Sequence, residues 1–153
     1  MSSPFSVRFA TRDDFEKWLP LWEGYNRFYG RSDATALPKQ MTETTWNRFF
    51  VPSERMHALV AESQGELCGL AHYLFHRSTT MLAHTCYMQD LFTAESMRNT
   101  GVAKALTLAV YEQAKLAGST KVYWQTHESN ATAMSLYNKI AERLGFLVYR
   151  KQI

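Results

Sequence analysis

The middle of the chain constrains the fold most, because it holds three apolar runs of strand length in close succession. Two of them, residues 57–63 and 66–76, are separated only by Gln64 and Gly65. A two-residue connection that ends in glycine is typical of a β-hairpin. A third run follows at residues 85–93 after a short loop. The sequence therefore predicts antiparallel strands at the centre of the fold.

Two helices are predicted before these strands. A short alternating strand over residues 5–10 leads into a stretch with apolar residues at helical spacing, which ends at Gly30. Pro20 lies inside this stretch and should kink or restart the helix. A second, shorter helix should open at Thr42 or Thr44, residue types that favour helix N-termini.

Helices and strands alternate in the rest of the chain. Residues 101–117 and 130–144 each carry one apolar face at helical spacing, and residues 121–126 and 146–150 are apolar enough for strands. Hairpins followed by alternating helices and strands imply an α/β fold. We expect one domain over residues 1–153, with a twisted mixed sheet of about six to seven strands flanked by about four helices.

Composition narrows the function classes. Apolar residues make up 46% of the chain, which suffices for a packed core, and 17 basic against 14 acidic residues give a charge of only +3. That charge is too small for a dedicated nucleic-acid binder. The two cysteines, Cys68 and Cys86, form neither a CxxC pair nor a disulfide framework. We expect a cytoplasmic chain without a metal, a membrane span or a nucleic-acid partner.

The segment around residues 98–104 has the pattern of an anion-binding site, because a predicted strand leads through a short loop into a helix that begins at glycine. Gly101 and Ala103 have almost no side chain, and Arg98 and Lys104 add positive charge. The first turn of a helix offers free N–H groups to an anion such as a pyrophosphate. Neither a GxxxxGK[ST] loop nor a GxGxxG fingerprint is present.

The pattern Arg98-x-x-Gly101-x-Ala103 resembles the acetyl-CoA signature of the GNAT superfamily of N-acetyltransferases. Residues 130–137, read with Gly-Phe at 145–146, are similar to a second segment of that family. The likeness is strongest to the small histone/polyamine and spermidine/spermine amine acetyltransferases. It covers nearly the whole chain in the order of its elements.

The resemblance implies a binding site for acetyl-CoA. It assigns the pyrophosphate to loop amides at the start of the helix, the pantetheine arm to the edge of the preceding strand, and a one-donor oxyanion site to a backbone N–H near Leu91. The residues implied in donor binding are Leu91, Phe92, Thr93, Arg98, Asn99, Thr100, Gly101, Val102, Ala103, Lys104 and Asn130. Asn99 stands where many members have glycine, so we expect either a loop that is less permissive or an asparagine in the left-handed conformation.

The resemblance also implies catalytic roles. Tyr137 matches the general acid of the family. Without this resemblance, its place on the apolar face of a predicted helix would indicate a tyrosine of the hydrophobic core. Asp90 is the first candidate for recognising or deprotonating the amine, and pairing with a nearby cation is the alternative. Glu128 is a weaker candidate base. The residues expected to bind the acceptor are Tyr25, Tyr29, Gln89, Trp124 and Gln125, with Tyr123 beside them. Tyr25 and Trp124 would suit the hydrophobic core equally well.

The function implied is transfer of an acetyl group from acetyl-CoA to a primary amine by direct attack. The amine could be a polyamine, a lysine side chain or an amino acid. Gln89 stands where spermidine-type enzymes carry glutamate, which weakens the polyamine reading and leaves a catalytically silent CoA-sensing domain as the alternative. A small basic nucleic-acid module is a third, weaker reading. By the same resemblance we expect a homodimer, with the last strand exchanged or paired at an edge.

Overall fold

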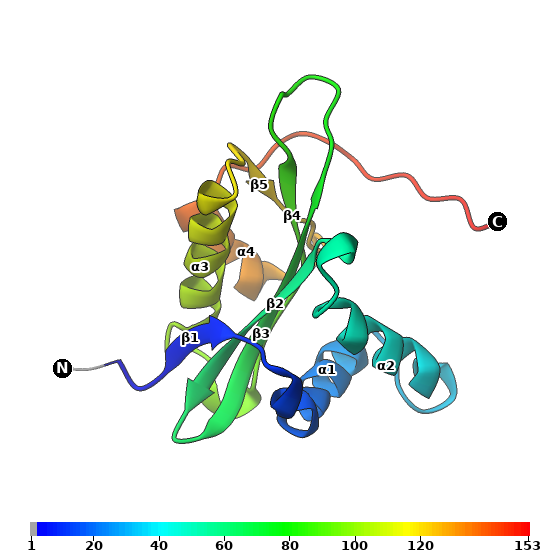
Figure 1. Cartoon of the computed structure of the whole chain (residues 1–153), viewed down its shortest axis with the longest axis vertical. Coiled ribbons are helices and arrows are strands. Elements are labelled where there is room, and N and C mark those ends of the chain that lie inside the picture. Colours follow the sequence, from blue (N-terminus) through cyan, green and yellow to red (C-terminus); the bar gives the residue numbers. More distant parts are fainter. Residues whose placement is uncertain (1–2) are drawn as a thin grey trace.

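The computed structural model describes residues 3–153, and in this range it contains a mixed five-stranded sheet (Figure 1). Neighbouring strands are antiparallel except the last pair, which is parallel. The predicted hairpin is confirmed, and the second and third central strands have the predicted bounds. In sheet order the strands are β1 (Ser6–Phe9), β2 (Met56–Ser63), β3 (Glu66–His76), β4 (Thr85–Thr93) and β5 (Val122–Tyr123).

Helices cover both faces of the sheet, as expected (Figure 1). On one face lie α1 (Phe15–Phe28) and α2 (Lys39–Arg48), and on the other lie α3 (Val102–Leu116) and α4 (Ala131–Ile140). Helix α1 continues through Pro20 rather than restarting there. Short 3₁₀ helices occupy Arg12–Asp14, Asp33–Thr35, Pro52–Glu54 and Glu95–Met97. Within residues 3–153, each helix is too short or too polar to cross a membrane.

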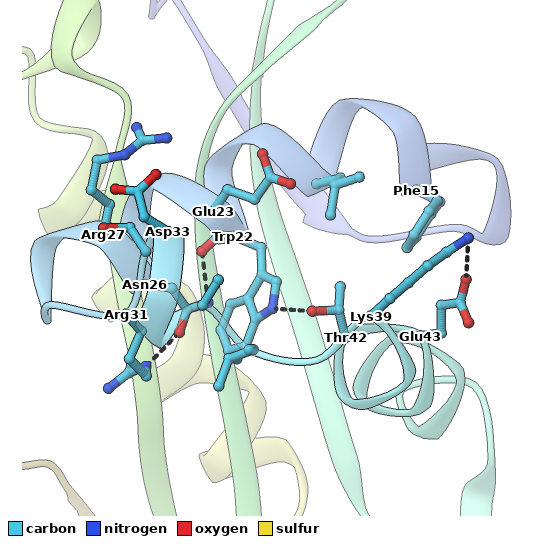
Figure 2. Close-up of a pocket in the computed structure, with 14 residues that line it drawn as sticks. Phe15, Trp22, Glu23, Asn26, Arg27, Arg31, Asp33, Lys39, Thr42 and Glu43 are labelled. Atoms are coloured by element: carbon cyan, nitrogen blue, oxygen red, sulfur yellow. Dashed lines mark hydrogen bonds and ion pairs between the residues drawn. The ribbon is translucent and has the colours of Figure 1, made fainter.

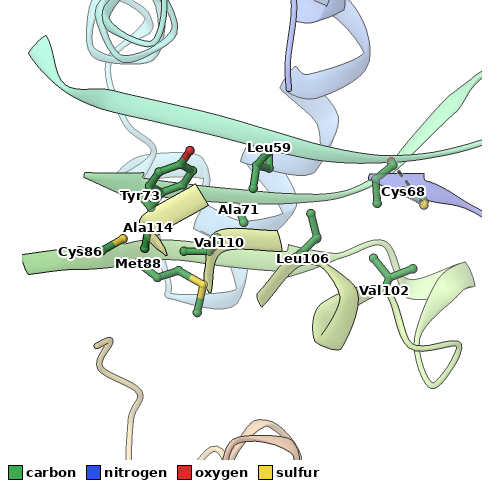
Figure 3. Close-up of a cluster of buried hydrophobic side chains, with 11 residues drawn as sticks. Leu59, Cys68, Ala71, Tyr73, Cys86, Met88, Val102, Leu106, Val110 and Ala114 are labelled. Carbon is green, nitrogen blue, oxygen red and sulfur yellow. Dashed lines mark hydrogen bonds between the residues drawn. The ribbon is translucent and has the colours of Figure 1, made fainter. Parts of the chain in front are cut away.

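The strands divide the interior into two cores, because alternate side chains point to opposite faces. On the α3 face, Leu106 and Val110 pack against the sheet in a cluster of mostly aliphatic and sulfur-containing side chains that also includes Tyr73 (Figure 3). On the α1 face, the core is aromatic and is built on Trp18, Trp22 and Trp46. Tyr25, one of the predicted acceptor-binding residues, belongs to this aromatic core.

A bulge in β4 decides which face carries Asp90. His72 on β3 pairs with Asp90, whereas Tyr73 pairs with Met88, so Gln89 is an extra residue without a partner of its own. In a regular strand, residues 88 and 90 would point to the same face. Because of the extra residue, Met88 enters the α3 core while the Asp90 side chain meets His72 on the α1 face.

The predicted last strand over residues 146–150 is wrong, and the sheet has five strands in residues 3–153 instead of six to seven. Residues 141–153, which we term the C-terminal arm, contain no helix or strand and lead away from the body (Figure 1). A strand needs a partner edge as well as an apolar sequence. The arm pairs with no strand among residues 3–153.

Three element boundaries also differ from the predictions. β5 spans two residues instead of 121–126, and α4 stops at Ile140 instead of 144, where nothing packs on the half-exposed Leu144. Helix α2 begins at Lys39 rather than at a threonine cap. Pro38 precedes it with a fixed φ that suits a helix start, and Thr42 instead accepts a hydrogen bond from Trp22 Nε1 at 3.3 Å.

Gly69 on β3 should be sensitive to substitution. A Cβ atom there would lie 2.7 Å from Cγ1 of Val102 and 3.1 Å from the carbonyl oxygen of Phe92, so α3 packs directly on this strand. We expect Gly69→Ala to lower the free energy of unfolding by about 1–3 kcal/mol. Urea unfolding measures this, with Gly145→Ala as the matched control, since a Cβ there meets open space. Equal stability of the two variants would contradict the packing.

Candidate active site

One edge of β4 is open beyond its short pairing with β5. Cys86 pairs with Val122 and Tyr87 with Tyr123, and the chain from residue 3 onward gives β4 no further partner on this side. The free edge runs to Thr93, whose hydroxyl is buried without a hydrogen-bond partner. An open edge can bind an extended ligand through backbone hydrogen bonds. The unpaired hydroxyl points to room for a polar ligand atom.

The loop that follows β4 presents a run of unpaired amides. Asn99 and Gly101 both adopt left-handed backbone conformations, with φ of 62° and 92°. Across residues 3–153, the amides of residues 99–104 find no hydrogen-bond acceptor. The charged groups of Arg98 and Lys104 lie beside them, exposed and outside every ion pair among the described residues. This arrangement suits a phosphate group.

The side chains around this loop mostly serve packing. Val102 is 1% exposed and belongs to the α3 core. Phe92 packs on the α1 side, where its ring lies against Gly24. Thr100 donates to the backbone carbonyl of Met97 at 2.5 Å. A ligand at this loop would therefore meet backbone groups and the two basic side chains rather than apolar ones.

Asp90 lies among the tyrosines that the sequence predicted for the acceptor. Burial and the Asp90 carboxylate together raise the pKa of Tyr25 far above its usual value. The same two causes raise the pKa of Tyr29, while the Arg31 guanidinium acts in the opposite direction. That guanidinium lies over both rings, 5.8 Å and 5.5 Å from their centroids. A negative and a positive group thus flank a pair of neutral phenols.

Arg31 is held from α1. Its Nε donates to Oδ1 of Asn26 at 2.7 Å, and Nδ2 of Asn26 donates to the backbone carbonyl of Trp22 at 2.8 Å (Figure 2). The terminal nitrogens of Arg31 meet no carboxylate partner in residues 3–153. All three residues line a cavity of about 530 Å³ between α1 and α2. Arg31 therefore joins this cavity to the tyrosine cluster.

Tyr137 reaches the same region from α4. Its ring contacts Trp124 edge-on, with centroids 5.2 Å apart. Burial raises the pKa of Tyr137 to about 12, and Tyr29 adds to the rise. The half-buried Tyr137 phenol keeps its proton at physiological pH, as a general acid must.

The other candidate residues are more scattered. Gln89 is exposed on the bulge, and Gln125 and Glu128 are exposed beyond β5. Trp124 packs on the α3 core beside Tyr111, which agrees with the core alternative for that residue. Two further candidates make local contacts: Asn130 caps α4 by accepting from the amide of Ala133 at 3.3 Å, and Tyr123 bonds His76 at 2.7 Å.

Two residues of the cluster escaped the sequence reasoning. Arg31 lies in the loop after α1 and His72 lies on β3, and neither was among the candidate site residues. His72 is 2% exposed and contacts Asp90 through Nδ1 at 2.9 Å. A regular continuation of the β3–β4 register would have set His72 opposite Gln89, so the pairing with Asp90 depends on the bulge. No sequence signal marks that bulge.

Comparisons with known proteins agree with this geometry. Residues 17–146 match the family model described as "Acetyltransferase (GNAT) family". The chain is 33% identical over 140 residues to the D-amino-acid N-acetyltransferase HPA3 of Saccharomyces cerevisiae, covering 90% of this chain and 84% of that protein.

Solved structures share the fold at low sequence identity. A ribosomal-protein-alanine N-acetyltransferase from Brucella melitensis has a TM-score of 0.78 at 16% identity, with 97% of this chain and 99% of that chain covered. The aminoglycoside N-acetyltransferase AAC(6')-Iy, in complex with a CoA-containing bisubstrate analogue, has a TM-score of 0.81 at 17% identity over 97% and 99% of the two chains.

Proposed function

Because the chain belongs to the GNAT family of acetyltransferases and is an acetyl-CoA-dependent N-acetyltransferase, we propose that its acceptor is the amino group of a free amino acid. The observation that carries the proposal is a pair of opposite charges beside Tyr25 and Tyr29: the Asp90 carboxylate, and the Arg31 guanidinium 5.8 Å and 5.5 Å from the two ring centroids. An amino acid carries an ammonium and a carboxylate on neighbouring atoms. The name of the yeast relative, a D-amino-acid N-acetyltransferase, supports the same class.

The donor would lie along β4 and the loop after it. The unpaired amides of residues 99–104 and the charges of Arg98 and Lys104 suit the pyrophosphate. The open edge of β4 suits the amide groups of the pantetheine arm, and the unpaired hydroxyl of Thr93 lies at its end. In this position the backbone N–H of Leu91 would polarise the thioester carbonyl, a contribution of about 2.7–4 kcal/mol for one such donor.

Asp90 would receive the acceptor amine. At pH 7 the amino group of a free amino acid is mostly protonated, so the attacking nitrogen must first lose a proton. The Asp90 carboxylate, 8% exposed, can accept that proton directly or through a water molecule.

Tyr137 would complete the transfer. The neutral amine attacks the thioester carbonyl, the C–N bond forms, and the C–S bond breaks as the tetrahedral intermediate collapses. The departing thiolate then takes the Tyr137 proton, which burial holds on the phenol. The new amide nitrogen loses its second proton, which restores the Tyr137 phenol directly or through water, and Asp90 releases the first proton to solvent. The products are the N-acetylated acceptor and free CoA.

An acceptor panel with paired compounds tests this proposal. CoA release should be fastest with free amino acids, and each L- and D-amino acid is compared with the amine that lacks its carboxylate, beside spermidine and a lysine-rich peptide. We expect Arg31→Gln to raise the KM for amino acids at least about tenfold, since it removes a charge-assisted bond, and to leave the carboxylate-free amines unaffected.

Arg27→Gln is the matched control for this panel. Arg27 lines the same cavity but is exposed, and it does not overlie the tyrosines. Its loss should leave the amino-acid KM unchanged. Faster turnover of spermidine or of the peptide than of every amino acid would overturn the choice of acceptor.

The homodimer expected from the sequence is also proposed, with the C-terminal arm as its contact. Four successive side chains of the arm, Phe146, Leu147, Val148 and Tyr149, are between 67% and 91% exposed. Monomers rarely expose a contiguous apolar segment of this kind. Pairing of the arm with the sheet of a second copy would bury these side chains and satisfy their backbone groups.

A further inference from the structure

His72 is a buried polar residue that the proposed chemistry leaves unused. It lies on β3 beneath α1, at 2% exposure, between fully buried Trp18 and the Asp90 carboxylate. The indole Nε1 of Trp18 is 3.0 Å from His72 Nε2. His72 Nδ1 is 2.9 Å from Oδ2 of Asp90. A continuous chain of hydrogen bonds therefore runs from the aromatic core to Asp90.

The chemistry of the Trp18 indole fixes which atom donates in each of these two hydrogen bonds. An indole N–H can only donate a hydrogen bond, so His72 Nε2 must accept and cannot carry a proton. The remaining proton of the neutral ring is then on Nδ1, which donates to Asp90. Trp18 thus selects one of the two tautomers of His72. The opposite tautomer would leave both the indole N–H and the carboxylate oxygen without a partner.

The walls around His72 hold the ring in place. Phe49, Trp22 and Trp18 surround it, with ring centroids 4.5, 5.4 and 5.8 Å from the imidazole. The backbone of His72 is fixed as well, because it pairs with Asp90 in the sheet. An N–H group held this firmly fixes the rotation of the carboxylate that accepts its bond. The other oxygen of Asp90 is then left for Tyr25 and the site.

We propose that His72, held in its Nδ1–H tautomer by Trp18, is a positioning residue that aims the Asp90 carboxylate at the acceptor amine. This inference rests on the proposed function, in which Asp90 receives the amine. His72 itself does not touch the substrate. Its contribution is to the orientation of a group that does.

The tautomer can be measured without turnover. The ¹⁵N resonances of histidine-labelled protein should show a protonated Nδ1 and an unprotonated Nε2 for His72, assigned by their loss in His72→Asn. Trp18→Phe should abolish this single tautomer. Trp22→Phe should preserve it, because Trp22 packs on the same ring but donates its N–H to Thr42. A protonated Nε2 in the unaltered protein would overturn the proposal.

Two substitutions at His72 separate positioning from packing. The amide nitrogen of asparagine falls near the former Nδ1 and can still donate to Asp90, whereas the amide of glutamine falls near the former Nε2 and serves Trp18. Each variant keeps one of the two bonds, so urea unfolding should give similar stabilities. Only His72→Gln should lower kcat, by about 10–100-fold, with the KM for acetyl-CoA unchanged.

The outcomes distinguish the two proposals. Equal kcat values for His72→Asn and His72→Gln, or losses that follow stability alone, would overturn the positioning role. If Asp90→Asn is inactive while His72→Gln matches the unaltered enzyme, the role of Asp90 stands and only the inference on His72 fails. If Asp90→Asn keeps full kcat, both proposals fail together.

Discussion

Tyr137→Phe should lower kcat by about 10²–10⁴-fold and leave the KM for acetyl-CoA almost unchanged. The substitution removes the hydroxyl that protonates the leaving thiolate but keeps the ring that packs edge-on against Trp124. Steady-state kinetics with a free amino acid as acceptor measure both constants. The loss should appear in kcat because the proton is transferred as the C–S bond breaks, after both substrates have bound.

Tyr111→Phe is the matched control for this experiment. Tyr111 also packs on Trp124, and its hydroxyl donates to the backbone carbonyl of Ile140 at 3.0 Å, away from the tyrosine cluster. We expect this variant to lose about 1 kcal/mol of stability and to keep its kcat. Similar kinetic losses in both variants would assign Tyr137 to packing rather than to acid catalysis.

The raised pKa of Tyr137 also predicts a pH effect on stability. The folded protein holds this phenol at a pKa of about 12, above its ordinary value of 10.0. Its contribution to stability is therefore fully present below pH 10 and is lost as the pH rises from 10 towards 12. Urea unfolding between pH 8 and 11 should thus show a smaller alkaline loss for Tyr137→Phe than for the unaltered protein.

Local patterns in the sequence were sufficient to predict the centre of the sheet and the donor loop. The hairpin residues Gln64 and Gly65 both adopt the positive φ that a two-residue turn needs, with values of 52° and 79°. The spacing of Arg98, Gly101 and Ala103 marked the amide-rich turn because that turn needs small residues at fixed positions. Both features depend on residues close together in the chain, so sequence alone could show them.

The acceptor side could be predicted only in part. Asp90, Tyr25 and Tyr29 were identified as candidates, but their geometry depends on one extra residue in β4 that turns Asp90 towards α1. A bulge of this kind leaves no mark in hydrophobic periodicity. The partnership of His72 with Asp90 and the position of Arg31 over the tyrosines follow from it and from the path of the loop after α1.

For the C-terminal arm the sequence predicted a strand that the structure does not contain. This difference leads to a prediction about the dimer. Residues 146–150 have the composition of a strand but pair with no strand among residues 3–153, and the sheet of a second copy could supply a partner. Val148→Pro removes the N–H at the centre of this segment and restricts its backbone. We expect the dissociation constant of the dimer to rise at least about 30-fold, measured by sedimentation over a range of protein concentrations.

The size of this effect follows from symmetry. In a two-fold dimer each substitution occurs twice, so the loss of one buried hydrogen bond, about 1–3 kcal/mol, is doubled in the free energy of association. Lys151→Pro is the matched control, because it places the same residue just outside the segment, where the exposed arm has no predicted pairing to lose. Equal effects of the two prolines, or a protein that sediments as a monomer before any substitution, would exclude pairing through residues 146–150. A selective effect of Val148→Pro would mean that the apolar sequence of the arm is a strand whose partner edge lies on another molecule.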